Sequence, residues 1–351
     1  MKPHRVFYVN IFGRPEFARA LAERTDIELV GFRDEAPDAE TDPIVRDALV
    51  YHVSSGVNDM SRRWWVEAEL LERAPRLLLA SAIGSGYDTI DVDACTRAGV
   101  LVVNQAGAGN AEAVAEHMFA VMIALSKRIV EADRRMRRAP GVIRGDYVGR
   151  NVRGKTAGIV GFGHVGKRLT ELCRLAFGMR VLVHDQRKRE ATIRGAGAEQ
   201  VALDTLLTQS DFVLVCCAYN EDTQGMFGAA QFALMPRHAC FITAARGGIH
   251  DEEALAQALG ERRIAGAGLD VWAVEPPDPA HPLLAFDQVI ATPHTAGATE
   301  ESRIDAALGA ARQIIDVIEG RPPAQLINPQ AWPRFADRYK AEFGRAPSDP
   351  G

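Results

Sequence analysis

The sequence predicts an α/β protein that contains two doubly wound parallel-sheet domains. Short apolar runs of strand length alternate with amphipathic helical stretches along most of the chain. This alternation is typical of parallel sheets with helices on both faces. The length of 351 residues suits about two domains at roughly 100–200 residues each. A glycine-rich turn near residue 161 opens a second series of strands and helices, so we expect one domain for each series.

The first series occupies the N-terminal third of the chain. Its expected strands are 6–11, 29–32, 49–53, 77–83 and 101–104, and its expected helices are 15–24, 61–73 and 91–98. One long helical pattern follows over 110–138 and ends in an arginine-rich stretch. Cations are favourable at a helix C-terminus, so we interpret this stretch as a solvated helix end rather than a nucleic-acid surface.

The second series follows a loop at 145–154. Its expected strands are 156–162, 180–184, 212–217, 239–243, 264–269 and 289–292, with helices expected near 165–175 and 251–259. A long helix is predicted over 300–319 and is ended by Pro322 and Pro323. The remaining residues are expected to form a polar tail with aromatic interruptions, which packs on the protein or across a dimer interface.

Charge and composition argue against several classes of function. The chain has 41 Lys and Arg against 46 Asp and Glu, a net charge of −5. This net charge gives no overall electrostatic attraction to nucleic acid or to an anionic membrane. No apolar run approaches the roughly 20 residues of a membrane span. The chain has five cysteines, an odd number, and no CxxC pair. This pattern is typical of reduced cysteines that form no disulfide bonds. We therefore expect a cytoplasmic protein that binds neither membrane nor metal.

The run TAGIVGFGHVGKRL contains the spacing Gly161-x-Gly163-x-x-Gly166 between an expected strand and an expected helix. Gly161 allows the tight turn, Gly163 lets the backbone approach a pyrophosphate, and Gly166 lets the helix pack on the strand. His164 and Val165 begin that helix, whose free N–H groups and positive dipole end favour phosphates. This context predicts a dinucleotide-binding Rossmann domain.

An acidic residue at the end of the next strand favours NAD as the cofactor. Asp185 follows Gly166 by 19 residues (185 − 166), close to the roughly 20 expected for the acid that binds a ribose 2′-hydroxyl. The basic residues Arg187, Lys188 and Arg189 follow at once. They are either a solvated helix start or a sign that NADP is tolerated, and we expect NAD, with NADP the less favoured cofactor.

Three further segments place polar side chains just after expected strands. They contain Arg246 beside two glycines, Glu275 before two prolines, and His294 after Pro293. Ligands of open α/β sheets bind outside the carboxyl ends of the strands. Arg can hold a carboxylate and a carbonyl as a fork, His can exchange the hydroxyl proton, and Glu can orient and stabilise the imidazolium. Together these types suit hydride transfer to or from a 2-hydroxy acid.

The sequence resembles the D-isomer-specific 2-hydroxyacid dehydrogenase family. The resemblance is carried by GFGHVG with Asp185, ARGGIHDEEAL, AGAGLDVWAVEPP and ATPHTAG, and earlier by ASAIGSGYDTIDVDACTRAGVLVVN and GNAEAVAEHM. It implies a Rossmann NAD-binding domain (106–295) inserted into a flavodoxin-like substrate-binding domain (1–105 and 296–351). It also implies a site in the cleft between the two domains and a homodimer formed through the helix 110–138.

The resemblance also implies roles for individual residues. Arg246, Glu275 and His294 match the catalytic triad, with Arg246 and His294 also next to the cofactor. Asp270 matches the residue that holds the nicotinamide amide, and Ala244 lies in a cofactor-lining segment. The loop Ile83, Gly84, Ser85 and Gly86 matches the loop whose N–H groups bind the substrate carboxylate, and Ser55 is a candidate for the same pocket.

Alternatives and departures remain. A formate dehydrogenase would pair the His with Gln, where this chain has Glu275, and a dinucleotide-sensing corepressor would use the same fold without turnover. Many relatives have a Pro where this chain reads Ala218-Tyr219-Asn220, which concerns the adenosine side of the cofactor. The residues before about 75 match only loosely, so the resemblance indicates the reaction class and leaves the identity of the 2-hydroxy acid open.

Overall fold

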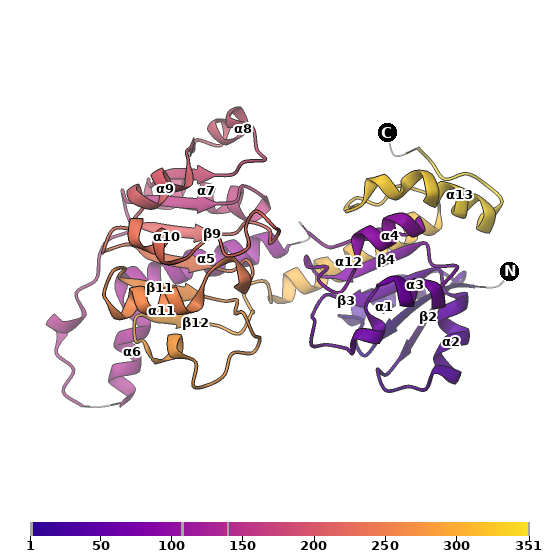
Figure 1. The fold of residues 1–351 in the computed structure, drawn as a ribbon, viewed down its shortest axis with the longest axis horizontal. Helices are drawn as coiled ribbons and strands as arrows, with labels where there is room; N and C mark the ends of the chain where they lie inside the picture. The colour runs from indigo at the N-terminus through magenta and orange to yellow at the C-terminus, as the bar shows by residue number, and fades with distance from the viewer. Residues whose placement is uncertain (1–2, 107–108, 139, 350–351) are drawn as a thin grey trace. The chain divides into compact units, whose positions relative to one another are not determined.

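The computed structural model describes residues 3–106, 109–138 and 140–349. The chain divides into two compact units, Met1–Asn110 with Thr299–Gly351 and, between them in sequence, Ala111–Ala298. The sequence-predicted domain limits at residues 1 and 351 lie outside the described residues. Each unit has its own parallel sheet, as Figure 1 shows.

The first unit contains a five-stranded parallel sheet with the order β2-β1-β3-β4-β5, the flavodoxin-like order. The strands are β1 (His4–Val9), β2 (Ile27–Phe32), β3 (Val50–Ser54), β4 (Leu79–Ile83) and β5 (Leu101–Val103). The helices are α1 (Pro15–Ala22), α2 (Asp38–Asp47), α3 (Ala68–Arg73), α4 (Val92–Ala98), α12 (Glu300–Ile318) and α13 (Trp332–Phe343), with short 3-10 turns at Arg62–Trp64 and Pro329–Ala331. The predicted helix over 61–73 was therefore too long, and α2 was not predicted.

The C-terminal segment belongs to the first unit and is not a polar tail. It forms α13, drawn in yellow beside the indigo and violet N-terminal elements in Figure 1. Phe335 and Tyr339 are fully buried, in one cluster with strands β1 and β4 and with α12. Tyr339 also donates its hydroxyl to Ile318 O at 2.9 Å. The aromatic residues recur at helical spacing because they form the buried face of this helix.

The second unit contains a seven-stranded parallel sheet with the order β12-β11-β10-β9-β6-β7-β8. The strands are β6 (Thr156–Val160), β7 (Arg180–His184), β8 (Glu199–Gln200), β9 (Phe212–Val215), β10 (Cys240–Thr243), β11 (Gly266–Leu269) and β12 (Val289–Ala291). The helices are α5 (Asn110–Lys127), α6 (Ile129–Arg138), α7 (His164–Phe177), α8 (Glu190–Gly195), α9 (Leu203–Gln209), α10 (Ala229–Leu234) and α11 (Glu252–Gly260), with 3-10 turns at Arg144–Tyr147, Gly247–Ile249 and Pro282–Ala285. Chain order reverses beside β6, as in a Rossmann sheet, which confirms the predicted fold class.

The predicted single helix over 110–138 is wrong, because the chain breaks between α5 and α6. Arg128 adopts a left-handed φ of 54°, which ends α5. The loop before β6 binds this end, since Arg150 N–H donates to Ser126 O at 2.7 Å and Ser126 Oγ donates to Arg150 O at 3.0 Å. A Cβ on Gly149 would lie 2.6 Å from Ser126 O. The loop therefore packs against the last turn of α5 and hydrogen-bonds to it, where a continuous helix would otherwise run on into α6.

The described residues include no helix that is both long and apolar enough to cross a membrane.

Candidate active site

The carboxyl ends of the strands in the second unit carry the residues predicted to bind a ligand. Strand β6 leads into Gly161, β7 into Asp185, β10 into Ala244 and Arg246, β11 into Asp270, and β12 into His294. Since all seven strands are parallel, these positions lie along one edge of one sheet.

The glycine-rich turn has the shape that a dinucleotide requires. Gly161 has φ +97°, and a Cβ there would lie 2.6 Å from Cys217 Cα. A Cβ on Gly166 would lie 2.1 Å from Gly161 O, whereas nothing lies within 4 Å of the position for Gly163. Gly163 is exposed and precedes α7 as its N-cap. Two glycines are thus needed for packing, and the third leaves open space at the start of a helix, where a pyrophosphate fits.

The carboxylate of Asp185 organises the surrounding turn. Phe162 N–H donates to Oδ2 at 2.7 Å, and Arg187 and Lys188 N–H groups donate to Oδ1 at 2.9 and 3.1 Å. A carboxylate oxygen accepts about two hydrogen bonds, so Oδ2 retains capacity for a ribose hydroxyl. The Arg187 side chain lies 3.2 Å from Asp222 Oδ2 in an exposed ion pair. The residues present therefore fit a nicotinamide dinucleotide, while the choice between NAD and NADP stays a prediction.

Glu275 and His294 form a direct pair. His294 Nδ1 lies 2.7 Å from Glu275 Oε2, and Trp272 N–H donates to Glu275 Oε1 at 3.1 Å. An ionised carboxylate only accepts hydrogen bonds, so Nδ1 of His294 carries the hydrogen. Nε2 is then the ring nitrogen that is left to exchange a proton with a ligand.

The pair shifts the pKa values of both groups. Burial raises the pKa of Glu275, but hydrogen bonds from His294 and Trp272, with the positive charges of His294 and Arg246, outweigh burial and hold it below its usual range. The hydrogen bond to Glu275 raises the pKa of His294, opposed by burial and by Arg246 and supported by the charges of Glu275 and Asp270. His294 is therefore held toward its protonated form, as a proton donor requires.

Asp270 holds the turn on which His294 lies. Its side chain is 1% exposed. Oδ1 accepts from Thr292 Oγ1 at 2.6 Å and from Thr295 N–H at 2.8 Å, and Oδ2 accepts from Ala296 N–H at 2.8 Å. The carbonyl of Asp270 also accepts the His294 N–H at 2.7 Å. This network supports the left-handed φ of 55° at His294, which is costly for a residue with a Cβ. The predicted contact of Asp270 with a nicotinamide amide stays a prediction.

Arg246 lies between β10 and a 3-10 turn. Its side chain is partly buried, and Nη1 donates to Ala245 O at 2.8 Å. A Cβ on Gly247 would lie 2.0 Å from Trp272 O, and one on Gly248 would lie 2.9 Å from the Tyr219 ring. Gly247 therefore lets the Arg246 loop approach the Trp272 loop that also carries Glu275, and Gly248 lets it approach Tyr219. Ala244, at the start of this loop, is partly buried.

The predicted substrate-binding residues other than Arg246 lie in the first unit, in the 83–86 loop and at Ser55 beside it. Ser55 Oγ donates to Ile83 O at 2.8 Å, and Gly84 has φ +89°. Gln105 N–H donates to Gly84 O at 2.7 Å, and Asn104 Nδ2 donates to Ser85 O at 2.7 Å. Ser85 and Gly86 are both partly buried. These hydrogen bonds use carbonyl groups of the loop as acceptors. The binding of a substrate carboxylate by the N–H groups of the loop stays a prediction.

Two polar residues near His294, Thr292 and His117, were not predicted from the sequence as site residues. Thr292 bridges Asp270 and His117, whose Nε2 lies 3.3 Å from Thr292 Oγ1. Both residues occur in motifs that carry the family resemblance, ATPHTAG and GNAEAVAEHM. Periodicity places His117 on a helix but does not show which strand end that helix meets.

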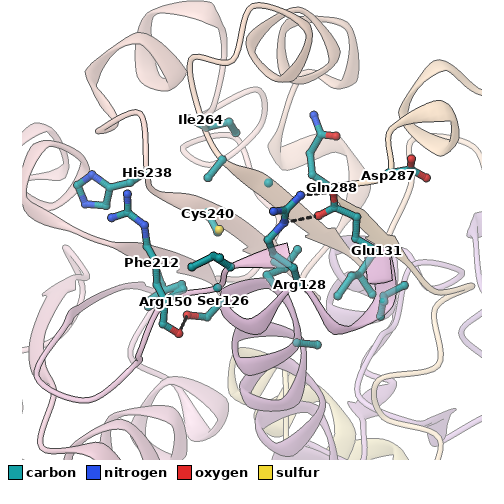
Figure 2. A pocket seen from close by; sticks show the side chains of 18 of the residues that line it. Ser126, Arg128, Glu131, Arg150, Phe212, His238, Cys240, Ile264, Asp287 and Gln288 are labelled. Atoms are coloured by element: carbon teal, nitrogen blue, oxygen red, sulfur yellow. Dashed lines mark hydrogen bonds and ion pairs between the residues drawn. The ribbon is translucent and has the colours of Figure 1, made fainter. Parts of the chain in front are cut away.

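A separate cavity of about 490 Å³ lies at the opposite, amino edge of the same sheet. Phe212 and Cys240, the first residues of β9 and β10, line it, and Figure 2 shows Arg128, Arg150 and His238 around it. None of the predicted site residues lines this cavity. Within the described ranges, no group of three or more His, Cys, Asp or Glu side chains could hold a metal ion.

Known proteins are similar to this chain over both units. The sequence model described as D-isomer specific 2-hydroxyacid dehydrogenase, NAD binding domain, matches residues 119–296. A glyoxylate reductase of Korarchaeum cryptofilum is 36% identical over 335 residues, covering 93% of this chain and 96% of that protein. A D-3-phosphoglycerate dehydrogenase of Archaeoglobus fulgidus is 37% identical over 263 residues, 75% of this chain but only 49% of that protein, so the chain spans about half of its length.

A solved structure agrees over nearly the whole chain. The crystal structure of D-lactate dehydrogenase from Aquifex aeolicus, complexed with NAD and lactic acid, has a TM-score of 0.78 at 27% identity and covers 92% of this chain and 98% of that one. The family's NAD-binding domain coincides with the unit that carries the glycine-rich turn and the His294–Glu275 pair. The chain belongs to the D-isomer specific 2-hydroxyacid dehydrogenase family.

Proposed function

We propose that this chain is an NAD-dependent reductase of small 2-keto acids, which interconverts them with D-2-hydroxy acids. The observation that carries the proposal is the 2.7 Å contact between His294 Nδ1 and Glu275 Oε2, on the sheet edge that also carries the dinucleotide turn. Glyoxylate, hydroxypyruvate and phosphoglycerate-type compounds are the candidate substrates. The glyoxylate reductase named above matches over nearly its full length, which supports the first of these.

The residues divide the work of reduction. Arg246 would hold the substrate carboxylate and carbonyl oxygen as a fork. Bound NADH would supply the hydride that reduces the carbonyl carbon. As the C=O bond becomes C–O, the electron pair moves to oxygen, and His294 would give that oxygen the proton from Nε2. Glu275 would keep Nδ1 protonated and stabilise the imidazolium before transfer.

The remaining residue roles are part of the same proposal. Gly161, Gly163, His164, Val165 and Gly166 would hold the pyrophosphate, and the free capacity of Asp185 Oδ2 supports ribose binding. The N–H groups of the 83–86 loop, with Ser55, would bind the substrate carboxylate. The NAD-binding description of the matching family and the negative charge of Asp185, which repels a 2′-phosphate, support NAD over NADP.

The test is turnover with a panel of 2-keto acids, followed by the absorbance of NADH. We expect glyoxylate or hydroxypyruvate to be reduced, and Arg246→Gln to abolish turnover while NADH still binds. A protein that binds NADH tightly but reduces no member of the panel would contradict the proposal and favour a dinucleotide-sensing role.

We also propose that the chain is a homodimer formed through residues 110–138. The support is that α6 buries none of its residues. Within this segment Ile129 is 53% and Met136 70% exposed, and just after it Ile143 is 65% and Val148 75% exposed. So many exposed apolar side chains in one segment indicate a protein partner. Light scattering should give twice the chain mass for wild type and the single mass for Ile129→Glu with Met136→Glu. Leu175→Glu, which replaces an apolar residue on α7 that is 75% exposed, is the matched control and should leave the dimer intact.

A further inference from the structure

We propose that His117, on α5, is a positioning residue that sets the conformation of the His294 turn through Thr292 and Asp270. His117 Nε2 lies 3.3 Å from Thr292 Oγ1 and 4.0 Å from Asp270 Oδ1. All of these residues belong to the second unit. The inference deepens the proposed function, because it concerns the placement of the proposed proton donor.

Counting hydrogens gives the direction of this chain of hydrogen bonds. A threonine hydroxyl has one hydrogen, and Thr292 Oγ1 uses it to donate to Asp270 Oδ1 at 2.6 Å. Thr292 Oγ1 must therefore accept from His117, so Nε2 of His117 carries a hydrogen. Donation by His117 polarises the hydroxyl and strengthens its bond to the carboxylate. His117 thus acts on Asp270 through the Thr292 hydroxyl.

The effect reaches His294 because Asp270 is its support. The Asp270 carboxylate holds the N–H groups of Thr295 and Ala296, and its carbonyl holds the His294 N–H. A left-handed residue that is not glycine persists only where its surroundings over-determine it. If Thr292 loses the donor from His117, the bond from its hydroxyl to Asp270 weakens, and the turn gains freedom. The imidazole of His294 then meets Glu275 in the paired geometry for a smaller fraction of the time.

A different observation argues against a purely space-filling role for His117. Its side chain is 24% exposed, whereas the apolar neighbours Met118 and Val114 on the same helix are 0% and 9% exposed. The polar contact to Thr292 is what an imidazole adds.

The experiment compares His117→Leu, which removes the donor, with His117→Gln, whose amide restores an N–H at similar reach. We expect kcat for 2-keto acid reduction to fall about five- to ten-fold in His117→Leu, a factor that matches the free energy of about one hydrogen bond, and to recover in His117→Gln. The dissociation constant of NADH should change by less than about two-fold. Glu116→Gln, the adjacent exposed position on α5, is the matched control and should behave as wild type.

A second readout does not require turnover. Titration of His294 by histidine NMR should give a lower imidazole pKa in His117→Leu than in wild type, with recovery in His117→Gln. If His117→Leu fails to fold, Thr292→Val and Thr292→Ser make the same comparison, since only Ser keeps the hydroxyl. Failure of wild type to reduce any 2-keto acid would refute the proposed function and leave this titration decisive.

Two results would overturn the inference. One is an unchanged kcat and an unchanged His294 pKa in His117→Leu, which would mean that the contact has no effect on the turn. The other is a His117→Gln variant as impaired as His117→Leu, with a matching loss of thermal stability, which would make His117 a packing residue.

Discussion

Removing the charge of Glu275 should move the proton-donor pKa of His294. Glu275→Gln keeps the size of the side chain, and its amide oxygen can still accept the hydrogen of His294 Nδ1. The substitution therefore removes the negative charge while preserving most of the geometry. Because Glu275 holds the pKa of His294 above its usual range, the variant should have the lower pKa.

The contacts set the size of this effect. The two side chains are 44% and 34% exposed, so water screens part of their interaction. Hydrogen bonds to charged groups contribute about 1.5–3 kcal/mol and exposed ion pairs about 0.2–1 kcal/mol. A half-exposed pair at 2.7 Å should contribute a free energy between these two ranges, about 1–1.5 kcal/mol, in favour of the protonated imidazole.

The assay is the pH profile of kcat for 2-keto acid reduction. Reduction needs protonated His294, so kcat should fall as pH rises through the His294 pKa. This fall should begin at lower pH in Glu275→Gln than in wild type, with NADH affinity unchanged. Asp211→Asn is the control, because Asp211 pairs with His238 at 3.0 Å beside the cavity at the opposite edge of the sheet. Profiles of wild type and Glu275→Gln that coincide, with normal NADH binding, would show that Glu275 does not tune His294.

Three further outcomes are expected. Arg246→Lys should raise KM and lower kcat, by about ten-fold or more in kcat/KM, because an ammonium cannot form the two-pronged contact; an unchanged kcat/KM with a lower melting temperature would make Arg246 structural. Wild type should have a higher kcat/KM with NADH than with NADPH because of the charge of Asp185, and equal use of NADPH would instead assign Arg187 to a 2′-phosphate. Burial lowers the pKa of His250 to about 4 from 6.5, so the unfolded chain binds the proton more readily and stability is lost as pH falls from about 6.5 to 4. At pH 5 this residue lowers the free energy of unfolding by about 2 kcal/mol. His250→Val removes that effect, together with two buried ring nitrogens that have no hydrogen-bond partner in the described structure. Urea unfolding of His250→Val should therefore show a smaller fall in stability between pH 7 and pH 5 than wild type.

Local sequence patterns determined the main features of the fold. The alternation of apolar runs with helical stretches reflects contacts along one strand or within a few helical turns, and it predicted two parallel sheets. The glycine at 166 is equally local, because a Cβ there would clash with Gly161 O in the same turn, whereas the close contact of Gly161 is with Cys217 after β9. Placing Arg246, Glu275 and His294 after strands needed only the rule that parallel strands end at one edge.

Packing between distant segments decided the rest. The helical pattern of 110–138 continues through Arg128, and only the approach of Gly149 and Arg150 explains the break there. The aromatic residues of the C-terminal segment face the N-terminal sheet, which cannot be read from their own spacing. His117 and Thr292 are 175 residues apart in sequence, so their contact depends on how α5 packs beside β12. Sequence alone therefore proposed the main chemical groups of the candidate site. The tertiary structure determined which hydrogen bonds hold them, because those bonds form only after distant segments have packed together.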